Sequence, residues 1–133
     1  MSSTEMLHAH PRAEGALVEV LARCMDACRT CVETCIACAD ACLAEEPLGD
    51  LRRCIRLDLD CAEICGATAN ILSRPRAEEA VAVRAIVEAC RDVCERCAAE
   101  CEKHASHHEH CRVCAEACRR CEAACGELLA ALA

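Results

Sequence analysis

Cysteine recurs through this chain at steps of three and four residues, and this spacing constrains the fold more than any other feature. Eighteen of the 133 residues are cysteine. The long runs are Cys24, Cys28, Cys31, Cys35, Cys38 and Cys42; Cys90, Cys94, Cys97 and Cys101; and Cys111, Cys114, Cys118, Cys121 and Cys125. An α-helix advances about 100° per residue, so such steps keep side chains on one face. Stripes of this kind usually consist of leucine and form a helical core. The spacing therefore predicts a helical bundle whose core is lined by thiols.

The residues around the cysteines favour helices over a disulfide scaffold. The chain has only four glycines and three prolines, and alanine, glutamate and arginine, which are strong helix formers, surround the thiols. The first residues lack the basic start, apolar run and cleavage site of a signal peptide. We therefore expect a cytoplasmic protein, and in a reducing cytosol dense cysteine indicates metal binding or redox chemistry.

Composition narrows the class of protein further. The length suits one domain, and the chain contains no Phe, Tyr or Trp, although aromatic residues usually dominate core volume. Metal–thiolate clusters could fill the core instead. A net charge of −8 argues against a nucleic-acid partner, since such proteins are usually basic. No apolar stretch approaches the roughly 18 residues that a membrane span requires.

Three breaks divide the chain into four expected helices. They fall at Pro47–Asp50, at Ser73–Pro75 and at Lys103–Ser106, where Ser106 and Glu109 have the spacing of a capping box. Short connections make neighbouring helices antiparallel, which predicts an all-α, up-down-up-down four-helix bundle with a Cys-lined core and a short N-terminal extension. The expected ranges are a tail or short extra helix over 1–13, then a bundle domain over 14–133 with helices at 14–45, 48–72, 76–103 and 107–131.

In that arrangement the two ends of the bundle differ. The cysteines of all four helices, including Cys54, Cys61 and Cys65 in the second, lie toward one end. The other end collects apolar residues, namely Leu17, Val20, Leu21, Thr68, Ile71, Leu72, Val83, Ile86, Val87, Leu128, Leu129 and Leu132. We call the first end the mouth and the second the base.

Histidines occur at the mouth, in the third connection. His104 continues the cysteine stripe of the third helix, and His107 and His108 lie one helical turn before Cys111. These three histidines are expected either to bind metal at the mouth or to form a solvated turn. His110 is out of phase with the stripe and is expected to lie outside. If the three bind metal, ions enter and leave through the mouth, because the apolar base would desolvate a cation at high cost.

Asp58 shares a helix face with Cys54 and Cys61. A buried carboxylate is rarely filler, so Asp58 is predicted to bind an ion near the mouth, to bond with a histidine or arginine, or to form a structural salt bridge. Leu59 points away from the core, which suggests a contact between subunits.

Charge balance distinguishes between the kinds of metal ion that a thiol-lined core could bind. The thiolate is the ligand, so loading must expel protons. Four thiolates around Zn²⁺ leave a charge of −2, and eighteen would hold about four or five such ions. A monovalent ion shared between thiolates gives about one ion per sulfur and a nearly neutral core, and thiolates select Cu(I). Two alternatives remain: a zinc or heavy-metal buffer, and a thiol redox protein. The ratio of bound metal to protein would distinguish both of them from a copper-binding protein.

The CxxxCxxC repeats, the CxxxC pair in each helix and the absence of aromatics resemble the bacterial copper storage proteins over about residues 14–131. The resemblance implies a four-helix bundle that holds many Cu(I) ions and assembles as a homotetramer. The chain is similar to the members that lack an export signal, and the resemblance implies storage rather than catalysis. It also implies that every cysteine from Cys24 to Cys125 is a copper ligand.

Overall fold

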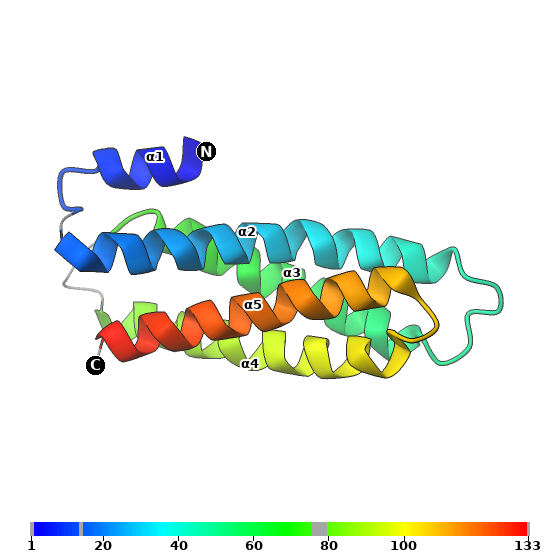
Figure 1. Cartoon of the computed structure of the whole chain (residues 1–133). Helices are drawn as coiled ribbons and strands as arrows, with labels where there is room; N and C mark the ends of the chain where they lie inside the picture. Colours follow the sequence, from blue (N-terminus) through cyan, green and yellow to red (C-terminus); the bar gives the residue numbers. More distant parts are fainter. Residues whose placement is uncertain (1, 14, 76–79, 133) are drawn as a thin grey trace.

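The computed structural model describes residues 2–13, 15–75 and 80–132, and within these ranges the chain is all-helical (Figure 1). The helices are α1 (Ser2–Ala9), α2 (Gly15–Leu43), α3 (Arg52–Leu72), α4 (Ala80–His104) and α5 (Glu109–Leu132). The four long helices form an antiparallel bundle in which α2 packs against α3 and α5, and α4 packs against the same two. The predicted fold class is confirmed.

Two helix starts differ from the predicted ones. Helix α3 begins at Arg52 rather than at 48, because Gly49 adopts a left-handed φ of +60° that helix does not allow. Helix α5 begins at Glu109, so Ser106 does not cap it. The carbonyl of His104 instead accepts the backbone N–H groups of His107 and His108, which closes a turn after α4. The expected start of the third bundle helix at 76 lies outside the described residues.

The N-terminal extension is a short helix rather than a tail. Helix α1 lies along the first half of α2 (Figure 1) and buries Leu7, which is 1% exposed. The ring Nε2 of His8 lies 2.8 Å from a carboxylate oxygen of Glu19 on α2. The burial of Leu7 and the polar contact of His8 therefore help to hold α1 against the base half of the bundle.

The base of the bundle has a closed inner layer and an open outer part. Thr68, Val87 and Leu128 are completely buried. Outside them lies a pocket of about 450 Å³ among the described residues. Its lining includes Arg12 and Arg74 as well as part of the predicted apolar set: Leu17, Leu21, Ile71, Leu72, Val83 and Leu132. The predicted apolar base is confirmed for the inner layer, while Leu17 is 40% exposed at the rim.

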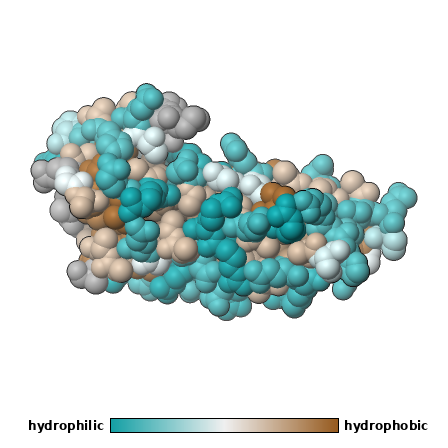
Figure 2. Space-filling view, viewed as in Figure 1, coloured by the Kyte–Doolittle hydropathy of each residue, from teal (hydrophilic) through white to brown (hydrophobic). Residues whose placement is uncertain are grey.

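The outer surface contrasts with the core. Figure 2 shows a largely hydrophilic face with hydrophobic side chains in two places, at the end where the chain termini lie and in a smaller patch nearer the middle of the bundle. Within the described part of the chain, none of the helices is long and apolar enough to cross a membrane.

Candidate metal centre

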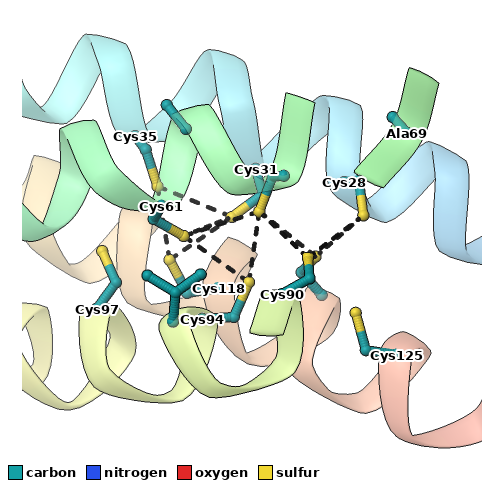
Figure 3. Packing of buried hydrophobic residues seen from close by; sticks show 14 of the residues in the cluster. Cys28, Cys31, Cys35, Cys61, Ala69, Cys90, Cys94, Cys97, Cys118 and Cys125 are labelled. Carbon is teal, nitrogen blue, oxygen red and sulfur yellow. Dashed lines mark hydrogen bonds between the residues drawn. The ribbon is translucent and has the colours of Figure 1, made fainter. Parts of the chain in front are cut away.

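The thiols occupy the centre of the bundle, as the stripe predicted. All eighteen cysteines are free, and each is at most 2% exposed. Figure 3 shows part of this core, in which sulfurs such as those of Cys31, Cys61 and Cys118 point toward one another from different helices. Neighbouring Sγ atoms lie between 3.5 Å apart, as in Cys65–Cys94, and 4.0 Å apart, as in Cys65–Cys121. The core is therefore a continuous column of sulfur in van der Waals contact.

Small side chains allow the helices to approach closely enough for these contacts. Ala69 and Ala98 are completely buried beside the cysteine stripes, and Ala62 is 6% exposed. The distance between packed helices depends on the side chains at the contact, so alanine flanking cysteine brings the helices together. The close approach of the helices thus compensates for the absence of aromatic residues.

The sulfurs gather in overlapping groups of four whose atoms all lie within 4.8 Å of one another. Five of these groups are Cys28, Cys90, Cys121 and Cys125; Cys31, Cys65, Cys94 and Cys121; Cys31, Cys35, Cys61 and Cys118; Cys35, Cys97, Cys114 and Cys118; and Cys38, Cys42, Cys54 and Cys111. The first four of these groups share members from one to the next: Cys121, then Cys31, then both Cys35 and Cys118. If neighbouring groups are filled together, these shared thiolates must bridge two ions.

Asp58 lies inside the sulfur column, and its partners are thiols. Its side chain is completely buried. Its Oδ1 accepts from the thiols of Cys97 at 3.1 Å and Cys114 at 3.2 Å, and lies 3.7 Å from the sulfur of Cys101. Its Oδ2 lies 3.9 Å from Cys54 Sγ. The expected burial is confirmed. Among the described residues no cation lies within ion-pair distance of Asp58, which leaves the salt-bridge interpretation without support.

Burial favours the protonated forms of Asp58 and of two thiols at the mouth, Cys42 and Cys111. It raises the pKa of Asp58 to about 9, with the nearby sulfurs of Cys114 and Cys54 adding to the effect, because a carboxylate loses its hydration inside the column. Loss of hydration also raises the pKa of Cys111 to about 12, and it raises the pKa of Cys42. In contrast, the hydrogen bond with Cys101 lowers the pKa of Cys54. At neutral pH Asp58, Cys42 and Cys111 are therefore protonated, and metal ions must displace these protons to bind there.

The histidine that reaches the thiols is His110, which was predicted to lie outside. Its Nδ1 lies 3.4 Å from Cys38 Sγ and 3.6 Å from Cys111 Sγ. The prediction was wrong because helical phase describes only a residue's own helix. His110 lies in the first turn of α5 and reaches across to Cys38 on α2. Its position next to Cys111 in the sequence was the one available signal.

The three histidines that were predicted at the mouth lie at that end, but they contact other groups. His104 is 8% exposed, and its ring nitrogens face Glu100 at 2.9 Å and Asp50 at 3.9 Å. His108 Nδ1 lies 3.0 Å from a carboxylate oxygen of Glu45. His107 is exposed. Their role as metal ligands stays a prediction.

A helical bundle with a thiol column, a buried carboxyl and a histidine at one end is a protein that takes up soft metal ions. The family model described as "Copper storage protein" matches residues 18–130. The chain therefore belongs to the copper storage protein family.

Solved structures agree with this assignment. The copper storage protein Ccsp from Streptomyces lividans, loaded with 10 copper equivalents, is 51% identical with a TM-score of 0.91, over 96% of this chain and 98% of that one. A cytosolic copper storage protein from S. lividans, solved with five coppers, is 56% identical with a TM-score of 0.82, over 84% and 93%. The Cu(I)-bound copper storage protein BsCsp3 is 36% identical with a TM-score of 0.71, over 80% and 94%. No curated protein sequence matches the chain significantly.

Proposed function

We propose that this protein stores Cu(I) in the cytoplasm, on the thiolates of its bundle core, and releases it again. Membership of a storage family, and relatives solved with bound copper, support this function. The similarity to a cytosolic copper storage protein of S. lividans supports the cytoplasmic location. We propose storage rather than catalysis, because buried thiols fill the interior of the bundle.

The sharing of thiols between groups is the observation that carries the choice of copper. Cys31 belongs to two groups of four and lies 3.7 Å from both Cys61 and Cys118. Bridging by such thiolates suits a monovalent ion, since one Cu⁺ per thiolate leaves the buried core nearly neutral. Divalent ions at the same sites would either be few or leave a large uncompensated charge in a low-dielectric interior.

The proposed ligands are the eighteen cysteines together with side chains at the mouth. Asp58 is proposed to bind copper after it loses its proton, since it lies within 3.2 Å of two thiols. His110 is proposed as a ligand through Nδ1. His104, His107 and His108 are proposed as an outer set that receives ions before they reach His110.

A zinc or heavy-metal buffer is the second candidate, and the groups of four favour it geometrically. Zinc–thiolate bonds of about 2.3 Å place tetrahedral sulfurs about 3.8 Å apart. The sulfurs of each group lie within 4.8 Å of one another, and the closest pairs are 3.5 Å apart. Distance therefore does not separate zinc from copper, whereas stoichiometry does.

We also propose that the protein is a homo-oligomer, a tetramer as in the family that it resembles. Ile36 and Leu43 on α2 and Leu59 on α3 are 52%, 62% and 48% exposed. Exposed apolar residues of this size on adjacent helices are typical of a surface that is covered in an assembly. Native mass spectrometry of the wild type and of Leu59→Glu tests this; a monomeric wild type would contradict it.

The test of the function is an anaerobic titration of the reduced protein with Cu(I), and separately with Zn²⁺, followed by native mass spectrometry. We expect roughly 18 Cu(I) ions per chain, because each thiolate is shared between ions. Saturation at four or five ions, with zinc displacing copper, would identify the zinc buffer. Oxidation to disulfides without metal uptake would identify a redox protein.

A matched pair of variants sharpens this test. Cys31 belongs to two groups of four, whereas Cys24 lies near the base, 3.8 Å from Cys125. Cys31→Ser should remove at least two Cu(I) ions, and Cys24→Ser about one. Equal losses would contradict bridging.

A further inference from the structure

One carboxylate joins the two chain connections that form the mouth. Glu45 lies two residues after the end of α2, in the connection to α3. Its Oε2 is 2.8 Å from His110 Nε2 and 3.0 Å from His108 Nδ1, both near the start of α5. The Glu45 side chain is 33% exposed, and the two imidazoles are about a quarter exposed. The contact is therefore partly shielded from water.

This contact determines which nitrogen of His110 carries the proton. A carboxylate only accepts hydrogen bonds, so His110 Nε2 must be the N–H donor to Glu45. In the neutral ring, Nδ1 then holds the lone pair. That atom lies 3.4 Å from Cys38 Sγ, so the electron pair that could bind a metal ion is directed at the thiols.

The neighbouring histidine at the mouth shows a different arrangement. Both ring nitrogens of His104 face carboxylates, those of Glu100 and Asp50. His110 has one nitrogen on a carboxylate and the other on thiols. A histidine that binds metal through one nitrogen usually donates its other N–H to a carboxylate, which fixes the ring and strengthens the ligand.

We propose that Glu45 is a positioning residue, which holds His110 with Nε2–H outward and Nδ1 toward Cys38 and Cys111, ready to receive the incoming ion. Glu45 itself does not contact the thiols. The inference rests on the proposed function, because it assigns His110 to copper uptake. It adds a residue from the α2–α3 connection to the residues that form the mouth.

The first test uses the metal-free protein and does not depend on copper. A hydrogen-bonded ring N–H exchanges slowly with water, so His110 Nε2–H should give a resolved downfield proton resonance at pH 8. Glu45→Ala should lose this resonance, and Glu45→Gln, whose amide oxygen still accepts, should keep it in part. Glu46→Ala removes an exposed carboxylate of the same connection and should leave it unchanged. Persistence of the resonance in Glu45→Ala would overturn the assignment.

The second test measures the rate of Cu(I) loading from a soluble Cu(I) complex. We expect Glu45→Ala to slow loading about tenfold, at the lower end of the effect of such orienting carboxylates. Glu45→Gln should recover part of the rate, and Glu46→Ala should match the wild type. In a His110→Ala background, Glu45→Ala should have no further effect, because the two residues act as one unit.

Two kinetic outcomes would overturn the proposal: an unchanged loading rate in Glu45→Ala, or an equal slowing in the His110→Ala background. Failure of the proposed function would look different. The wild type would then take up no Cu(I), while the ring N–H resonance would still report whether Glu45 holds His110.

Discussion

The two ends of the bundle are built from the same four helices but contain different chemistry. At the base, Val87 and Leu128 are completely buried in an apolar layer. At the mouth, thiols lie against Asp58 and His110, and carboxylates hold the histidines. The difference separates two tasks. Apolar burial at the base stabilises the fold without metal. Burial of polar groups at the mouth is destabilising, but these groups can bind and release ions.

The largest expected effect concerns the base. Leu128→Ala removes a completely buried side chain and should lower the free energy of unfolding of the metal-free protein by about 2–5 kcal/mol. The copper count should change little. Urea denaturation of the reduced protein, followed by circular dichroism, measures the effect.

Leu17→Ala is the control, because Leu17 is 40% exposed. This substitution should lower the free energy of unfolding by about 1 kcal/mol or less. The metal-free wild type should show a strongly helical spectrum that changes little on loading. A random-coil spectrum without metal would contradict the stabilising role of the base, because it would show that the fold depends on bound metal.

A smaller effect is expected at Asp58. Its pKa is about 9 in the fold, against an ordinary value of about 4 when unfolded. The folded state therefore binds more protons between these values, and its stability falls as pH rises through this window. An asparagine side chain cannot ionise, so Asp58→Asn removes this pH-dependent loss of stability. The free energy of unfolding of the metal-free variant should therefore exceed that of the wild type by on the order of 2 kcal/mol at pH 7.5.

The difference between Asp58→Asn and the wild type should shrink toward pH 5, where Asp58 is protonated in the fold. Denaturation curves at the two pH values measure this. A difference that is constant with pH would mean that Asp58 is already ionised in the metal-free protein. The same variant should also bind fewer Cu(I) ions at the mouth, if the carboxylate is a ligand as proposed.

The smallest effect is expected in kinetics. His110→Ala should slow Cu(I) loading at least about tenfold, which corresponds to about 1.4 kcal/mol or more in the barrier. The combined replacement of His104, His107 and His108 by alanine should slow it less, about twofold, because these rings contact carboxylates or solvent. Stopped-flow absorbance of copper–thiolate formation measures both. Total capacity should stay almost unchanged, and equal rates in all three proteins would show that the mouth histidines are only a solvated turn.

Much of the core could be predicted from the sequence because it depends on one helix at a time. The three- and four-residue steps placed every cysteine in the interior, and the same count placed Asp58 among them. The breaks at Pro47 and Pro75 separated the helices, and short connections set their antiparallel order. The shift in the start of α3 came from Gly49, whose φ of +60° extends the turn.

The partners of each side chain could not be predicted in the same way. His110 and Cys38 are 72 residues apart and meet only because α5 packs beside α2. Glu45, in an irregular connection, carries no periodic signal at all, yet it contacts two histidines.

The sequence by itself determined the helices, the thiol-lined core and the family, because helical periodicity is local and cysteine at core positions is rare. Only the tertiary structure decided which thiols group in fours, which histidine reaches them and which carboxylate holds it. The physical reason is that these contacts depend on the spacing and rotation of neighbouring helices, which follow from the packing of the whole bundle.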